Sequence, residues 1–138
     1  QHVQSAIKIK KSNVEVIPTG YILIDGGNHS SVQRVSNTTP IGADDIDECI
    51  STAVAGELLG MKLIYLEAGS GAAVAVSTEM ISAVKQQLNI PLIVGGGIKT
   101  TEQLISALNA GADLIVVGNI FETETGKIAE FINYVRNL

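Results

Sequence analysis

Near the middle of the chain stands Lys62-Leu63-Ile64-Tyr65-Leu66-Glu67-Ala68-Gly69-Ser70-Gly71, an apolar run that ends in two closely spaced glycines. Its first six residues lack the polar and apolar alternation of a half-exposed strand, which indicates a strand buried on both faces of a parallel sheet. Similar runs predict three further strands at residues 15–24, 91–95 and 113–118, the first interrupted by a proline and a glycine. The sequence therefore predicts four parallel strands.

A helical pattern follows each predicted strand. Apolar residues recur at spacings of three and four, so that one stripe of each helix can cover the sheet. Ser77 is expected to cap one helix, and Thr100 with Gln103 is expected to form a capping box on the next. The predicted helices cover residues 44–59, 78–88 and 100–111, and a last one carries Ile128, Phe131, Ile132 and Val135. Residues 1–11 predict an additional helix that belongs to an earlier unit.

Length limits the fold that these units can build. A (β/α)8 barrel needs roughly 250 residues, whereas this chain has 138. Right-handed crossovers would arrange successive strands side by side. We therefore expect one α/β domain over residues 1–138, as half a barrel or a small open sheet.

Composition excludes several classes of protein. The formal net charge is −5 and the basic residues are scattered, which argues against nucleic-acid binding. The sequence has no apolar stretch of about 18 residues and no apolar core of a signal peptide, so we predict no membrane span. The single Cys49 favours a cytoplasmic location without disulfides. His2 and His29 have no metal-ligand spacing, and we predict no metal site in this chain.

Three consecutive predicted strands end in small residues, at Gly69-Ser70-Gly71, Gly95-Gly96-Gly97 and Gly118-Asn119. In parallel α/β proteins, ligands bind at these carboxyl ends. Glycine lets backbone N–H groups approach an anion closely, which indicates a phosphate site. The simpler alternative is that each glycine only makes a tight turn. A dinucleotide site is disfavoured, because Val74 stands where the third small residue of that fingerprint belongs.

Glu67 ends a very apolar strand directly before the first glycine loop. There its side chain can act as a general base or orient a hydroxyl group, although an acid at a strand end can also simply cap a loop. Tyr65 lies two residues earlier and shares the same face of the strand. Its hydroxyl can bind a polar ligand or be satisfied within the core.

The segments 65–72, 93–98 and 116–119, together with residues 16–24 upstream, resemble the geranylgeranylglyceryl phosphate synthase family and its bacterial heptaprenylglyceryl phosphate synthase relatives. The similarity covers nearly the whole chain. It implies the C-terminal half, four βα units, of a (β/α)8 TIM barrel. It also implies a prenyltransferase of ether-lipid synthesis, in which the C3 hydroxyl of sn-glycerol 1-phosphate attacks C1 of a polyprenyl diphosphate, expected to be geranylgeranyl diphosphate.

The resemblance also implies roles for particular residues. Glu67 would accept the proton of the attacking hydroxyl, and Tyr65 with Glu67 would bind the glycerol hydroxyls. The phosphate would lie against Gly96, Gly97, Gly118 and Asn119, with help from Ser70 and Gly71. The complete set of implied substrate-binding residues is Tyr65, Leu66, Glu67, Ala68, Gly69, Ser70, Gly71, Gly96, Gly97, Gly118 and Asn119.

Members of this family place an Asp-Pro motif for Mg²⁺ at the end of the first barrel strand, and this chain has none. The Mg²⁺ ligands are therefore expected in an N-terminal half that is not in this sequence, and a homo-oligomer is expected. A half-barrel that must pair with another partner is the alternative, disfavoured because its open strand edge would invite aggregation. Two other functions stay open, a non-catalytic phosphate-binding half-barrel and another phosphate-binding barrel enzyme such as an isomerase. The glutamate within residues 65–71 argues against the isomerase.

Overall fold

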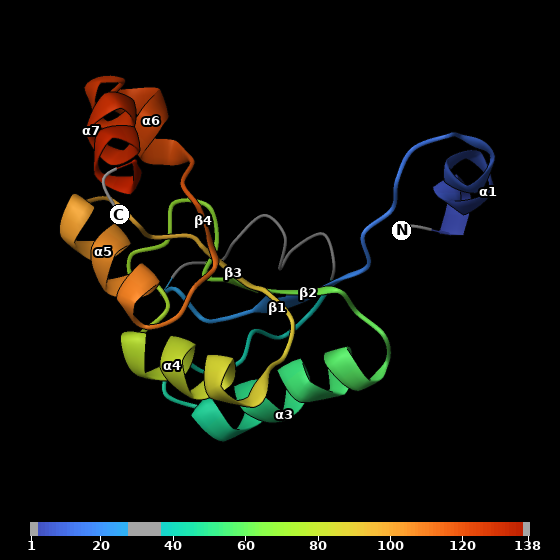
Figure 1. Cartoon of the computed structure of the whole chain (residues 1–138). Helices are drawn as coiled ribbons and strands as arrows, with labels where there is room; N and C mark the ends of the chain where they lie inside the picture. The colour runs from blue at the N-terminus through green and yellow to red at the C-terminus, as the bar shows by residue number, and fades with distance from the viewer. Residues whose placement is uncertain (1–2, 28–36, 137–138) are drawn as a thin grey trace.

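The computed structural model describes residues 3–27 and 37–136, so the two histidines considered above lie outside the described part. Helices and strands alternate along most of the chain (Figure 1). Their order is α1 (Val3–Lys11), β1 (Thr19–Leu23), α3 (Ile46–Leu58), β2 (Leu63–Glu67), α4 (Thr78–Gln87), β3 (Leu92–Gly95), α5 (Thr101–Asn109), β4 (Leu114–Val116), α6 (Asn119–Thr123) and α7 (Gly126–Val135).

The four strands form one parallel sheet in the order β1-β2-β3-β4. Leu23 pairs with Glu67, Glu67 with Gly95 and Gly95 with Val116. Because these pairs lie at the last residues of the strands, all four carboxyl ends reach the same edge of the sheet. The predicted parallel α/β fold is confirmed, and the loops after β2, β3 and β4 begin side by side.

The core lies between the sheet and its helices. Ile64, Leu66, Leu92 and Val94 are fully buried and belong to the same apolar cluster as the stripe of α4 that carries Ile81. Figure 1 shows α3 and α4 next to each other on one side of the strands, and the two helices are in contact. Strand alternation therefore directs Ile64 and Leu66 toward the helices and Tyr65 and Glu67 toward the opposite face.

A smaller apolar cluster joins the last elements of the chain. Ile98, Leu104 and Phe131 are buried together, and the rings of Phe121 and Phe131 meet edge to face with centroids 5.5 Å apart. This cluster holds α5, α6 and α7 near β4, on the side of the sheet where the third glycine loop lies.

Helix starts follow the predicted caps. The Ser77 hydroxyl accepts a hydrogen bond from the Met80 N–H at 3.2 Å, and Thr100 with Gln103 forms the reciprocal capping box. The helix predicted at residues 44–59 begins at Ile46, because the Asp45 carboxylate accepts the Glu48 N–H and caps the helix at that point.

Two strand boundaries differ from the sequence prediction by two residues or more. The first strand begins at Thr19 and not at residue 15, because Pro18 can offer its carbonyl to the Lys62 N–H but has no N–H of its own to give. The fourth strand ends at Val116, two residues early, and α6 follows at once. The five residues of α6 are too few to produce a helical periodicity in the sequence, which is why this helix was not predicted.

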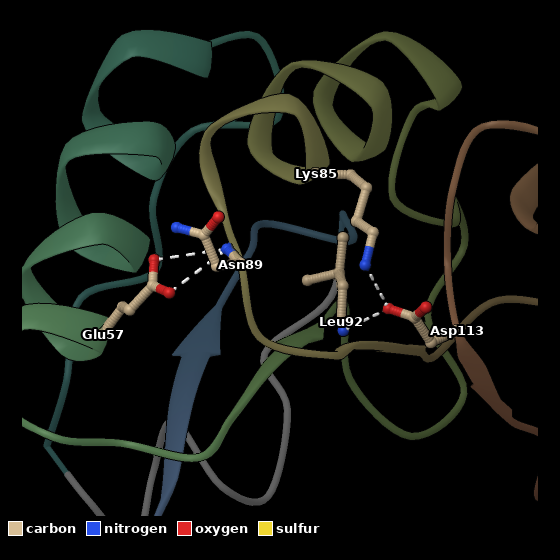
Figure 2. A network of polar contacts seen from close by, with 5 residues as sticks. All are labelled: Glu57, Lys85, Asn89, Leu92 and Asp113. Carbon is tan, nitrogen blue, oxygen red and sulfur yellow. Dashed lines mark hydrogen bonds and ion pairs between the residues drawn. The ribbon is translucent and has the colours of Figure 1, made fainter.

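A polar network lies at the amino ends of the strands, opposite the glycine loops (Figure 2). The Lys85 ammonium lies 2.6 Å from the Asp113 carboxylate, which also accepts the Leu92 N–H at 2.7 Å. Close by, the Glu57 carboxylate accepts the Asn89 N–H at 3.2 Å. These bonds join α4 and α3 to the segments that lead into β3 and β4, and they mark this edge as structural.

Helix α1 stands apart from the rest of the described chain in Figure 1. Its apolar residues Val3 and Ile7 are 86% and 68% exposed, and Lys8, Lys10 and Lys11 form its last turn. The additional helix predicted for residues 1–11 is thus present from Val3. Among the described residues, no helix has the length and apolar character needed to cross a membrane.

Candidate functional site

A cavity of about 290 Å³ opens at the carboxyl edge of the sheet. It lies between the loops that follow β2, β3 and β4, together with the start of α6. Its lining consists of Glu67, Gly69, Ser70, Gly71, Gly96, Gly97, Ile98, Lys99, Val116, Val117, Gly118, Asn119, Ile120 and Thr123. Eight of the residues singled out in the sequence therefore surround one space.

Three of the singled-out residues do not line this cavity. Leu66 is fully buried in the core on the helix face of the sheet, where strand alternation directs it. Ala68 is 4% exposed and its N–H donates to the Gly95 carbonyl at 2.9 Å, which continues the β2–β3 ladder. Tyr65 is not among the lining residues but lies next to Glu67, which is, and next to Gly95.

The glycines after β3 are required by the packing of the loops. Gly96 has φ +84°, and a Cβ at this position would lie 2.6 Å from the Gly69 nitrogen and 2.8 Å from Glu67 Oε1. Gly97 has φ +73°, and a Cβ there would lie 2.8 Å from the Ala75 nitrogen. Both positions favour glycine for conformation and for space. The glycines therefore do serve the tight turns that the simpler alternative proposed. The same close packing also holds the loops after β2 and β3 together beside the cavity.

Glu67 is the only charged side chain among the described residues that is buried, with 8% of its surface exposed. Its Oε1 accepts the Gly69 N–H at 2.8 Å. The carboxylate therefore caps the first glycine loop, which is one of the two roles that the sequence suggested for it. It also lines the cavity, as the other role requires. A carboxylate held in this way is pre-oriented toward a ligand.

Tyr65 lies beside the Glu67 carboxylate. A Cβ on Gly95 would lie 2.4 Å from the Tyr65 hydroxyl and 3.0 Å from Glu67 Oε2, so the missing side chain at Gly95 makes room for this pair. Burial, and then the hydrogen bond to Glu67, raise the pKa of Tyr65 well above its usual range. The hydroxyl therefore stays protonated and donates to Glu67.

Tyr21 extends this arrangement to β1. Its ring meets that of Tyr65 edge to face, with centroids 4.9 Å apart. Burial and the nearby Glu67 carboxylate raise the pKa of Tyr21 to about 12. The two rings form an apolar wall below the carboxylate, on the sheet face opposite the helices.

A side-chain hydrogen bond closes the cavity between the first and third loops. Ser70 Oγ donates to Asn119 Oδ1 at 2.7 Å, across 49 positions of sequence. Because the amide oxygen is engaged, the Asn119 NH₂ group is left to donate elsewhere, and it lies 3.7 Å from the position of a Cβ on Gly71. Two kinds of hydrogen-bond donor thus border the cavity, this NH₂ group and the backbone amides of the glycine loops.

Sequence reasoning missed several lining residues. The cavity has apolar walls formed by Ile98, Val116, Val117 and Ile120, and Lys99 is the one basic residue in its described lining. Lys99 directly follows the glycine triplet and Ile98, so its position beside the second loop was the available signal. The apolar residues gave no signal, because their patterns are those of any buried strand.

The described part of the chain contains no group of three or more His, Cys, Asp or Glu side chains that could hold a metal ion. The residues around this cavity therefore do not fit a protein-bound Mg²⁺ by themselves. No role of the metal is assigned to them.

Parallel βα units with a glycine-lined cavity at the carboxyl edge of the sheet are typical of part of a (β/α)8 barrel. The chain belongs to the PcrB family, whose model matches residues 1–135. This result confirms the resemblance inferred from the sequence.

The curated relatives of this chain are consistent with this family assignment. It is 55% identical over 122 residues to a geranylgeranylglyceryl phosphate synthase from Zunongwangia profunda, an alignment that covers 88% of this chain and 52% of that protein. It is 40% identical over 129 residues to the protein of that name from Saccharolobus solfataricus, covering 94% and 50%. The chain thus spans about half the length of the curated relatives it matches.

A solved structure provides the matching fold. The (S)-3-O-geranylgeranylglyceryl phosphate synthase from Thermoplasma acidophilum, in complex with sn-glycerol-1-phosphate, superposes with a TM-score of 0.81 at 42% identity. The superposition covers 86% of this chain and 47% of that one. The predicted α/β fold, with the βα units of half a TIM barrel, is confirmed.

Proposed function

We propose that this chain is the C-terminal half of a prenyltransferase that joins a polyprenyl group, expected to be geranylgeranyl, to the C3 hydroxyl of sn-glycerol 1-phosphate. The observation that supports it most directly is the cavity in which three glycine loops surround the buried Glu67 carboxylate. The names of the relatives and the glycerol phosphate bound to the Thermoplasma acidophilum protein support the choice of substrate.

The phosphate group of the substrate would lie against the glycine loops. Backbone amides of Gly96, Gly97 and Gly118 are suited to bind phosphate oxygens, as is the Asn119 NH₂ group, and Ser70 with Gly71 borders the same space. Apolar residues around this space lower its local polarity, which strengthens each of these hydrogen bonds. Such a site binds a compact anion and leaves the glycerol end toward Glu67.

Glu67 would direct the chemistry. Its carboxylate accepts the proton of the C3 hydroxyl while that oxygen forms a bond to C1 of the prenyl group. The bond between C1 and the diphosphate oxygen breaks, and diphosphate leaves with the electron pair. The Tyr65 hydroxyl and the Gly69 N–H hold the carboxylate in place, so the chain contributes mainly positioning and a proton acceptor.

The residues for the metal and for most of the prenyl group are proposed to lie outside this chain. Mg²⁺, when bound, would neutralise charge on the departing diphosphate, and its ligands are proposed to lie in the preceding half of the polypeptide together with most of the prenyl groove. Cytoplasmic location and a homo-oligomeric state remain predictions from the sequence.

The test replaces the proposed base in the whole polypeptide. Glu67→Gln keeps an oxygen for the Gly69 N–H but removes the proton acceptor, so we expect turnover to fall by about 10²- to 10⁴-fold while glycerol 1-phosphate still binds. Turnover is measured with prenyl diphosphate and Mg²⁺, and binding by calorimetry.

Glu15→Gln is the matched control, because Glu15 is exposed and remote from the cavity. Full activity of Glu67→Gln would remove the base role. Binding of glycerol 1-phosphate by the unmodified polypeptide without any turnover would instead support a phosphate-binding protein without catalytic activity.

A further inference from the structure

The proposed substrate brings negative charge into a cavity that already contains a carboxylate. Glycerol 1-phosphate carries a charge of about −2 near neutral pH. Glu67 lines the same space, and the chain has a formal net charge of −5. Neutral backbone amides orient a phosphate but do not balance these charges. A cation at the cavity would lower the repulsion.

Lys99 is the only basic residue among the described residues that line this cavity. Its side chain is exposed, whereas the described ion pairs of the chain, Lys85–Asp113 and Lys127–Glu130, use other lysines. Within the described residues, the Lys99 ammonium has no carboxylate partner. Its charge is therefore not already neutralised within the described structure.

The backbone of Lys99 is held firmly even though its side chain is exposed. The Lys99 N–H donates to Gln103 Oε1 at 2.7 Å, and the same oxygen accepts the Thr100 N–H at 3.1 Å as part of the capping box of α5. The ammonium group is thus carried on a flexible stem from a rigid point beside the second glycine loop. This geometry suits a residue that meets an incoming anion and follows it into the site.

From these observations we infer that Lys99 is a further substrate-binding residue, whose ammonium group pairs with the phosphate of glycerol 1-phosphate at the mouth of the cavity. The inference rests on the proposed function. Lys99 raises the affinity and the association rate for the phosphorylated substrate, and it takes no part in proton transfer. It also favours phosphorylated over unphosphorylated glycerol, because only the former carries charge.

The experiment compares Lys99→Gln with Lys99→Arg in the whole polypeptide. Lys99→Gln should raise the Kd for glycerol 1-phosphate, and for inorganic phosphate as a competing probe, by about tenfold, with kcat nearly unchanged. Its Kd should also depend less on salt, because one charge pair has been removed. Lys99→Arg should stay within about threefold of the unmodified protein, since the charge is kept.

Lys62→Gln is the matched control, because Lys62 is also exposed but stands at the amino edge of the sheet, directly before β2. An unchanged Kd and salt dependence in Lys99→Gln would overturn the assignment, as would an effect confined to the KM of the prenyl diphosphate. Failure of the unmodified polypeptide to bind glycerol 1-phosphate would instead remove the proposed function. The two failures are therefore distinguishable.

Discussion

The environment of Glu67 shows how single residues build this site. The Oε1 atom of its carboxylate accepts the Gly69 N–H, and the Tyr65 hydroxyl lies near the same carboxylate, where the missing side chain of Gly95 leaves room. A buried carboxylate without such partners would be strongly disfavoured. The bonds that make burial tolerable also give the side chain one orientation toward the cavity.

At the residue scale, Gly96→Ala should damage the protein more than Gly60→Ala. Both glycines have positive φ, +84° and +92°, so a side chain is strained at either position, at a cost of about 1 kcal/mol. A Cβ on Gly60 would meet nothing within 4 Å, whereas one on Gly96 would lie 2.6 Å from the Gly69 nitrogen. The added clash should bring the loss to about 3 kcal/mol.

Urea unfolding of the two variants in the whole polypeptide measures this difference, and glycerol 1-phosphate binding should be lost only in Gly96→Ala. Equal stability of the two variants would show that the loops after β2 and β3 can move apart to accommodate a Cβ at position 96.

At the scale of helices and strands, the two edges of the sheet have different roles. The carboxyl edge carries glycine loops around a cavity, whereas the amino edge carries the network of Lys85, Asp113 and Glu57 in Figure 2. In (β/α)8 barrels, the active-site residues lie at the carboxyl edge of the sheet, whereas residues at the amino edge contribute to stability. Substitutions at the amino edge should therefore change stability and leave ligand binding intact.

Asp113 tests this division. Asp113→Asn keeps an oxygen for the Leu92 N–H but removes the ion pair with Lys85, and since Asp113 is 40% exposed, the loss should be about 0.5 kcal/mol. Asp113→Ala also leaves the Leu92 N–H without its acceptor, so we expect about 1–2 kcal/mol. Thermal unfolding gives the ranking. A larger effect of Asp113→Asn than of Asp113→Ala would contradict it.

The pH dependence of this network has a defined sign. Partial burial opposes ionisation of Asp113, but the hydrogen bonds from Lys85 and from the Leu92 N–H outweigh it and lower the pKa below the usual 3.8. A lowered pKa means that the contribution to stability is present above about pH 4 and is lost as the pH falls through the folded-state value. The unfolding free energy of Asp113→Ala should accordingly decrease less between pH 4 and pH 2 than that of the unmodified protein.

At the scale of the whole molecule, the sheet face opposite α3 and α4 carries apolar side chains that are exposed. Tyr21, Leu114 and Val116 share this face through the strand register and remain 46%, 52% and 45% exposed. The relatives are about twice as long as this chain. We propose that the rest of the polypeptide covers this face in the working protein.

The 138-residue chain expressed alone should therefore expose an apolar surface. We expect it to bind the dye ANS and to self-associate in sedimentation experiments, because strand edges and apolar side chains are uncovered. The whole polypeptide should neither bind ANS nor form aggregates of mixed size in sedimentation experiments. A monomeric 138-residue chain that does not bind ANS would argue that this face is stable in water.

Local pattern alone predicted much of the fold. Residues close together in sequence predicted the four parallel strands and their helices. They also predicted the caps at Ser77 and Thr100 and the glycine loops. Errors arose where local signals are weak, at the start of β1 beside Pro18 and in the short α6. The residues suggested for the site were drawn from contiguous loops, and Leu66 was included although alternation along the strand buries it in the core.

The amino-acid sequence by itself determined which segments become strands and helices and that small residues end three strands, because these features depend on neighbours within a few positions. Only the tertiary structure decided that Ser70 bonds Asn119, that Gly95 makes room for Tyr65 and Glu67, and that Lys99 lines the same cavity. Each of these contacts requires the register of adjacent strands and the path of separate loops, and both are set by packing of the whole sheet against its helices.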